Sequence, residues 1–158
     1  MDSYKSVDDE NHEFKISAAA RRFLRMKTKL ADTHKNKKVI IISARVHPGE
    51  AVSSHIMRGF IDYVLGDTKE ARTIRKNYIV KIVPMLNPDG VIYGNYRASL
   101  LGVDLNRRWA HPSRVAHPTI YYTKKLIKIM SESHKVAYYV DLHGHSRKRN
   151  SFMYGWVT

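Results

Sequence analysis

The sequence predicts an α/β fold with a mostly parallel or mixed sheet flanked by helices, because strand-like and helix-like segments alternate along it. Three short runs rich in β-branched and aromatic residues, 38–45, 78–83 and 136–142, are separated by longer amphipathic segments. Residues 39–42 are apolar at every position, as expected for a strand that is covered on both faces. The length of 158 residues suits one domain.

Helices are predicted where apolar residues recur at helical spacing, over residues 16–31, 51–65 and 118–134. A short helix that ends at about Lys76 is predicted as the third in chain order. The apolar stripe of the second helix is predicted to consist of Ile56, Met57, Phe60, Ile61, Val64 and Leu65. The sequence Asp67-Thr68-Lys69-Glu70 can form a capping box before the third helix.

Two further segments lack these patterns. The polar, acidic residues 1–14 are expected to be a flexible lead-in, which leaves 15–158 as the domain. The stretch 85–116 is dense in Asn, Pro, Gly and Arg and is too long for a simple connector. Loops of this length are usually functional or disordered, so we expect this one to contribute to a site.

The composition restricts the partners and the chemistry. A formal net charge of +14 favours acidic partners such as acidic polypeptides, anionic membranes or nucleic acid. The absence of cysteine excludes disulfide bonds and thiolate metal sites, so any metal must be held by nitrogen and oxygen. No signal-peptide pattern and no apolar run of membrane-spanning length are present, so we expect a cytoplasmic protein without a membrane partner.

The first candidate site is His47-Pro48-Gly49-Glu50, which directly follows the first predicted strand. An imidazole and a carboxylate at this spacing can serve as two zinc ligands. The same spacing also occurs in surface turns, in which Gly49 would supply flexibility and Glu50 would begin a helix. The tetrapeptide alone therefore does not establish a metal site.

His143, which follows the third predicted strand, would complete a set of two histidines and one carboxylate, with His145 as a competing candidate. Three protein ligands leave one coordination position open, which is typical of catalytic rather than structural zinc. Ligands of open α/β sheets gather beyond the carboxyl ends of the strands. All these residues are therefore expected in one crevice.

Four separated motifs carry a family resemblance: Ala44 to Glu50, Asn87 to Arg97, Asp104 to Arg107, and Asp141 to Asn150. Together they resemble the zinc metallocarboxypeptidases, and among these the cytosolic carboxypeptidases, whose best-known members trim glutamates from tubulin tails. The resemblance extends over about Lys38 to Gly155 and implies that this sequence is the N-terminal half of the catalytic domain.

The resemblance implies that His47, Glu50 and His143 bind one zinc ion. Asp104 matches the carboxylate that orients an imidazole ligand, here that of His47. Asp104 could instead simply form a turn. Asp141, two residues before His143, could be a buried partner for a backbone amide.

The resemblance also implies substrate contacts. Asn106 and Arg107 match the pair that grips the C-terminal carboxylate of the substrate. Arg97 matches the arginine that polarises the scissile carbonyl and stabilises the oxyanion. As alternatives, Asn106 could form a turn and the two arginines could be surface charges. Trp109 is expected to take part in packing.

The glutamate that acts as general base in this family is expected beyond the end of this sequence, so two functions stay open. The first is the metal- and carboxylate-binding part of a carboxypeptidase that removes C-terminal glutamate from tubulin-type acidic tails. Such a protein is expected in the cytoplasm, associated with microtubules or cilia. The second is a non-catalytic basic module that binds acidic polymers such as microtubule tails, with nucleic acid less favoured.

Overall fold

The computed structural model describes residues 22, 25 and 34–155. The chain divides into two units, Met1–Lys35 and Asn36–Thr158, and every element discussed below lies in the second unit. The lead-in predicted for residues 1–14 lies outside the described residues. The helix predicted for residues 16–31 also does, except that Arg22 and Arg25 are helical.

Three parallel strands form a sheet in the order β2-β1-β3. Their bounds are Lys38–Ala44 for β1, Tyr78–Val83 for β2 and Val136–Leu142 for β3. The α/β class with a parallel sheet is thus confirmed. β1 is the central strand and most of its residues are buried, which explains its unbroken apolar run.

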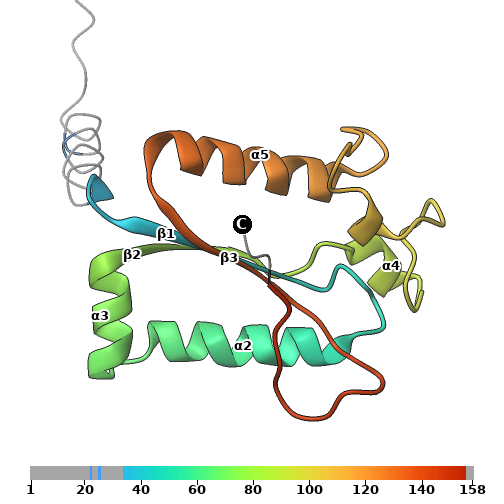
Figure 1. Cartoon of the computed structure of the whole chain (residues 1–158), viewed down its shortest axis with the longest axis horizontal. Helices are drawn as coiled ribbons and strands as arrows, with labels where there is room; N and C mark the ends of the chain where they lie inside the picture. The colour runs from blue at the N-terminus through green and yellow to red at the C-terminus, as the bar shows by residue number, and fades with distance from the viewer. Residues whose placement is uncertain (1–21, 23–24, 26–33, 156–158) are drawn as a thin grey trace, which may run out of the picture. The chain divides into compact units, whose positions relative to one another are not determined.

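Helices cover both faces of the sheet (Figure 1). α2 (Ala51–Leu65) and α3 (Lys69–Asn77) connect β1 to β2, whereas α5 (Pro118–Ser133) leads into β3 and lies on the opposite face from α2. A parallel pair of strands needs such a crossover, and helices supply it here. Within the part of the chain that is described, no helix combines the length and the apolar character that crossing a membrane requires.

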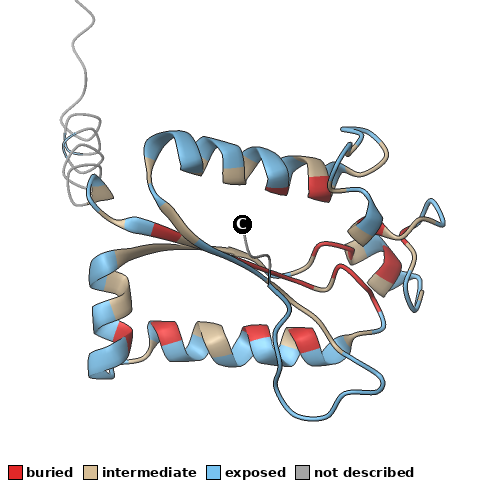
Figure 2. Cartoon of the chain, viewed as in Figure 1, coloured by how far each residue is buried: buried red, intermediate tan, exposed pale blue. Residues whose placement is uncertain are grey.

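Two apolar clusters form the core, and the buried residues lie along the sheet and on the helix faces turned to it (Figure 2). One cluster contains Ile42 and Ala44 of β1 and Met57 of α2. The other joins segments that are distant in the sequence: Val46, Leu86, Leu105 and Ile120. The second cluster therefore anchors the long predicted loop to the sheet and to α5.

The predicted apolar stripe of α2 is partly wrong. Met57 and Val64 are buried, but Ile56 and Leu65 are 46% and 72% exposed. Helical geometry explains the difference, because each of these two residues lies about a quarter turn to one side of the line through Met57 and Val64. Ser53, which is completely buried, lies on the inner face instead.

The predicted capping box before α3 is also wrong. Thr68 rather than Asp67 is the N-cap, and its hydroxyl accepts a hydrogen bond from the Ala71 backbone N–H at 3.1 Å. Glu70 consequently lies one position too early in the helix to complete the reciprocal bond of a capping box. It remains in the first turn, where a carboxylate interacts favourably with the helix dipole.

The stretch predicted as a loop from 85 to 116 contains two short helices, α4 (Pro88–Ile92) and the 3-10 helix η1 (Leu105–Arg107). The Asn87 side chain, 1% exposed, explains the start of α4. Its amide oxygen accepts from the Gly90 N–H at 3.0 Å, and its amide nitrogen donates to the Val46 carbonyl at 3.2 Å. One side chain thus caps a helix and fixes the backbone beside His47.

Replacing Asn87 with alanine should lower the free energy of unfolding by about 2–3 kcal/mol, because it removes a helix cap and leaves a buried carbonyl unpaired. Urea denaturation of the purified chain measures this change. Asn77→Ala, which alters an exposed asparagine at the end of α3, is the matched control and should shift stability by less than about 0.5 kcal/mol. Equal effects of the two substitutions would contradict the assigned role of Asn87.

Candidate metal centre

The backbone turns sharply where it leaves β1. Arg45 has a positive φ of 56°, which is costly for a residue with a side chain. Contacts from two other segments hold it there: the Ser53 hydroxyl accepts from the Arg45 N–H at 3.3 Å, and the Asn87 N–H donates to the Arg45 carbonyl at 3.0 Å. The turn that presents His47 is therefore fixed by both α2 and the segment after β2.

Gly49 is required by a close approach to Tyr96. Its N–H donates to the Tyr96 carbonyl oxygen at 2.7 Å, and a Cβ at this position would clash with the Tyr96 ring. The alternative in which Gly49 merely supplies flexibility is therefore not the whole explanation. Glu50 occupies the N-cap position of α2, as the turn interpretation expected, but its side chain makes no capping hydrogen bond. The Glu50 carboxylate instead points toward His47 and His143.

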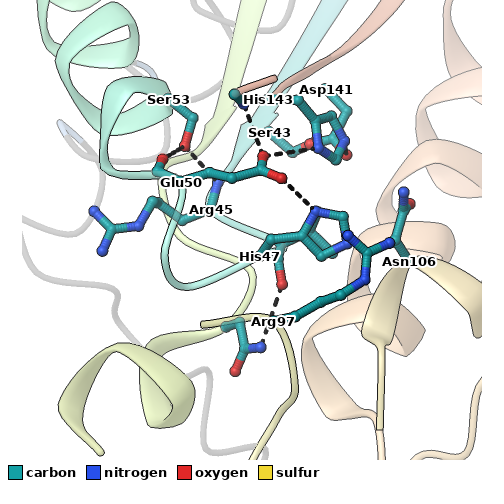
Figure 3. A network of polar contacts seen from close by, with 12 residues as sticks. Ser43, Arg45, His47, Glu50, Ser53, Arg97, Asn106, Asp141 and His143 are labelled. Atoms are coloured by element: carbon teal, nitrogen blue, oxygen red, sulfur yellow. Dashed lines mark hydrogen bonds and ion pairs between the residues drawn. The ribbon is translucent and has the colours of Figure 1, made fainter. Parts of the chain in front are cut away.

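The Glu50 carboxylate meets two imidazoles (Figure 3). His47 Nδ1 lies 2.8 Å from one carboxylate oxygen, and His143 Nδ1 lies 3.1 Å from the other. The Gly144 backbone N–H donates to the second oxygen at 2.7 Å. One potential ligand atom from each of the three side chains lies within 4.8 Å of the other two. The structure therefore brings together the three predicted zinc ligands.

Parallel pairing explains why His143 arrives at this place. Ala44 of β1 is the register partner of Leu142 of β3, so the segments that follow these two strands leave the sheet side by side at its carboxyl end. His145, the competing candidate, lies outside the group of three. It is exposed, and its Nδ1 accepts hydrogen bonds from the backbone N–H groups of Arg147 and Lys148.

Each imidazole has an aspartate on its other side. His47 Nε2 lies 3.1 Å from Asp104, and His143 Nε2 lies 2.8 Å from Asp141. Both nitrogens of each ring therefore face a carboxylate, which can only accept. When a ring carries a single proton and that proton is on Nε2, the Nδ1 lone pair is directed toward Glu50 and is available to a metal ion. Histidine ligands of metal sites usually donate their second N–H in this way.

These contacts shift two pKa values. The hydrogen bond to Asp141 raises the pKa of His143 above its ordinary value, and the charges of Asp141 and Glu50 add to the rise against the opposing effect of burial. Burial acts to raise the pKa of Asp104. The Asn106 backbone N–H and the charges of His47 and Arg97 outweigh this effect, so the pKa of Asp104 lies below its ordinary value.

The donor set suits zinc. It offers two imidazole nitrogens and one carboxylate, which is an established combination for a catalytic zinc site. The rings are already oriented by carboxylates, and their centroids are 5.2 Å apart. The residues present therefore fit the ion that the resemblance implies.

Asp104 links the candidate centre to the predicted oxyanion arginine. Nε and Nη2 of Arg97 lie 2.9 and 2.8 Å from one Asp104 oxygen, while the Arg97 side chain remains 49% exposed. The other oxygen faces His47 and also accepts from the Asn106 N–H at 2.8 Å, which caps η1. Asp104 is therefore a turn-former as well as the partner of an imidazole, and these two interpretations are compatible.

The two predicted carboxylate-binding residues occupy different environments. Asn106 is partly buried, and its side-chain oxygen accepts from the Trp109 indole N–H at 3.0 Å. Because an indole can only donate, the NH₂ group of Asn106 must point away from Trp109. Arg107 is exposed, and its guanidinium has no ion-pair partner among the residues described.

Some contacts were not predicted from the sequence. Trp109 packs against the core, as expected, but it also fixes the Asn106 amide. Asp141 binds the side chains of Ser43 and His143 rather than a backbone amide. The Asp-x-His spacing could have indicated the second contact, because residues two apart in a strand lie on the same face.

Comparison with known proteins supports one family. Residues 13–158 match the family model described as zinc carboxypeptidase. The chain is 52% identical over 132 residues to cytosolic carboxypeptidase 3 of Mus musculus, a match that covers 84% of this chain and 13% of that protein. It is 51% identical over 122 residues to cytosolic carboxypeptidase 1 of Homo sapiens, covering 77% of this chain and 10% of that protein.

Solved structures agree. A metallo-carboxypeptidase from Burkholderia cenocepacia superposes with a TM-score of 0.63 at 31% identity, covering 69% of this chain and 29% of that chain. One from Pseudomonas aeruginosa, in complex with (2-guanidinoethylmercapto)succinic acid, gives 0.63 at 31% identity, covering 70% and 28%. This chain thus spans a small part of the length of its relatives, and by its sequence and fold it belongs to the zinc carboxypeptidase family.

Proposed function

We propose that this chain is the zinc-binding and carboxylate-binding part of a metallocarboxypeptidase that hydrolyses peptide bonds at the C-termini of acidic polypeptides. The observation that carries the proposal is the meeting of His47 Nδ1, His143 Nδ1 and the Glu50 carboxylate, with both Nε2 atoms held by aspartates. When bound, zinc would supply Lewis-acid polarisation of the scissile carbonyl.

The other residues have proposed roles in substrate binding. The NH₂ group of Asn106, which points away from Trp109, and the exposed Arg107 guanidinium would bind the terminal carboxylate. Arg97, held by Asp104, would stabilise negative charge developing on the carbonyl oxygen. The general base that the resemblance implies is not assigned to any residue of this chain.

We also propose that the substrate is an acidic tail of the tubulin type and that the protein acts in the cytoplasm, near microtubules or cilia. The net charge of +14 supports an acidic partner, because it raises the encounter rate with polyanions. The relatives named above are cytosolic carboxypeptidases, which supports the cytoplasm.

The first test is zinc stoichiometry by equilibrium dialysis. We expect one zinc ion per chain in the unaltered protein and none tightly held in His143→Ala, because two remaining ligands hold zinc weakly. His55→Ala, which alters an exposed histidine on α2, is the matched control and should retain the ion. A folded chain that binds no zinc, yet still binds glutamate-rich peptides equally well with and without His47→Ala, would favour the non-catalytic basic module instead.

Zinc affinity should weaken as the pH falls, and the weakening should begin above pH 6.5, the ordinary pKa of histidine. The reason is that the pKa of His143 is raised, so protons compete with the metal at a higher pH.

The free energy of unfolding of the metal-free chain should instead increase as the pH falls. The contribution of the protonated ring is fully present below about pH 6.5 and is lost as the pH rises through the raised pKa. Calorimetric zinc titrations and urea denaturation across this range measure the two trends; parallel trends would contradict the assignment.

Arg107→Ala should reduce the preference of the chain for a free over an amidated peptide C-terminus by about tenfold, which corresponds to about 1.4 kcal/mol. Fluorescence anisotropy with a labelled peptide ending in glutamate, in free-acid and amide forms, measures this ratio in the zinc-loaded chain. Arg108→Ala removes the neighbouring exposed charge and serves as control, since it should weaken both peptides equally. Equal effects of the two substitutions on the ratio would assign Arg107 to the general basic surface.

A further inference from the structure

Three polar side chains of β1 and β3, those of Tyr139, Ser43 and Asp141, form a hydrogen-bonded row that leads to His143. Ser43 and Asp141 are register partners on these strands, and Ser43 is completely buried. The Ser43 hydroxyl donates to one Asp141 oxygen at 2.7 Å, while the other Asp141 oxygen faces His143 Nε2 at 2.8 Å. The Tyr139 hydroxyl lies 2.9 Å from the Ser43 oxygen. The row therefore ends on the third predicted zinc ligand.

The direction of each hydrogen bond follows from counting protons. A carboxylate only accepts, so Ser43 and His143 both donate to Asp141. The single hydroxyl proton of Ser43 is then used, and Tyr139 must donate to Ser43. Bonds aligned in one direction polarise one another, so the hydrogen bond from Tyr139 strengthens the one that Ser43 donates to Asp141.

The burial of polar side chains on the central part of the sheet calls for a physical explanation. Ser43 follows the apolar residues 39–42 on the central strand, where a β-branched apolar residue would bury equally well without a polar group to satisfy. Asp141 is also largely buried, with 15% of its side chain exposed. Burying a carboxylate costs free energy unless a partner group and hydrogen bonds offset the loss of its hydration. The only imidazole that Asp141 contacts among the described residues is that of His143.

We propose that Asp141, held by Ser43 and Tyr139, is a positioning residue that keeps the His143 proton on Nε2 and so presents an unprotonated Nδ1 to the metal. The inference rests on the proposed zinc site and adds to it a second carboxylate, the counterpart for His143 of what Asp104 provides for His47. The interaction acts through the tautomer and orientation of the ring, not through contact with substrate.

The first measurement is zinc affinity of the full chain by competition with a chromogenic chelator. Asp141→Asn should weaken zinc binding about 10- to 100-fold, because the ring loses the carboxylate that fixes it. Ser43→Ala and Tyr139→Phe should have smaller effects in that order, since each acts one bond further from the ring. Asp62→Asn, an exposed carboxylate-to-amide change on α2, is the matched control and should leave the affinity unchanged.

The second measurement reads the tautomer directly and needs no metal. In the metal-free chain labelled with ¹⁵N-histidine, at a pH where the ring is neutral, His143 should carry its proton on Nε2. Asp141 is the nearer of the two carboxylates that face the ring, at 2.8 Å from Nε2 against 3.1 Å between Glu50 and Nδ1. In Asp141→Asn the signals should shift toward a mixture of tautomers, because an amide can present either its oxygen or its NH₂ group to the ring. Loss of stability alone would not produce this shift in the folded molecules.

The outcomes separate the two proposals. If the unaltered chain binds no zinc, the proposed function fails, and the tautomer measurement still decides the role of Asp141. If the unaltered chain binds zinc but Asp141→Asn changes neither affinity nor tautomer, the positioning role is overturned and the zinc site stands. The same conclusion holds if the substitution lowers only the stability, which would make the row a structural link between the strands.

Discussion

The pairing of β1 with β3 is the contact on which the candidate centre depends. His47 and Glu50 follow β1, whereas His143 follows β3, and only the register of the two strands brings them together. A slip of one residue would turn the β3 side chains to the opposite face of the sheet. The same register aligns Ser43 with Asp141, so the hydrogen bond between these two side chains also opposes a slip.

The charges around this contact are arranged in two layers. Glu50, Asp104 and Asp141 surround two imidazoles, which gives a basic chain a locally acidic centre suited to a cation. Arg97 and Arg107 lie outside this centre and are exposed, so their positive charges are accessible from solvent. Asp104 contacts both layers, because one of its oxygens faces His47 and the other faces Arg97.

The long segment after β2 is anchored to the rest of the domain by buried contacts that its polar composition does not reveal. Leu86 and Leu105 are buried in one cluster with Val46 and Ile120, and Asn87 bonds to the backbone at Val46. These anchors surround the part of the segment that carries Arg97 and Asp104. Side chains that must be held within a fraction of an ångström are better carried by such anchored backbone than by a free loop.

The sequence by itself determined the strands, the main helices, the parallel α/β class and the family, because these depend on local periodicity and on short motifs. It also predicted that His47, Glu50 and His143 would meet, since all follow strands of one sheet. It did not determine that Thr68 would be the α3 cap, that Ile56 would be exposed, or that a helix would begin at Pro88.

The tertiary structure alone decided which polar groups pair. Ser43 and Asp141 are 98 residues apart, and the contact of Arg97 with Asp104 depends on how a folded segment is anchored. A hydrogen bond needs its partners within about 3 Å and correctly aligned. Only the completed packing of strands and helices fixes atoms to that accuracy. The sequence therefore showed which polar residues are present, but not which of them form hydrogen bonds with one another.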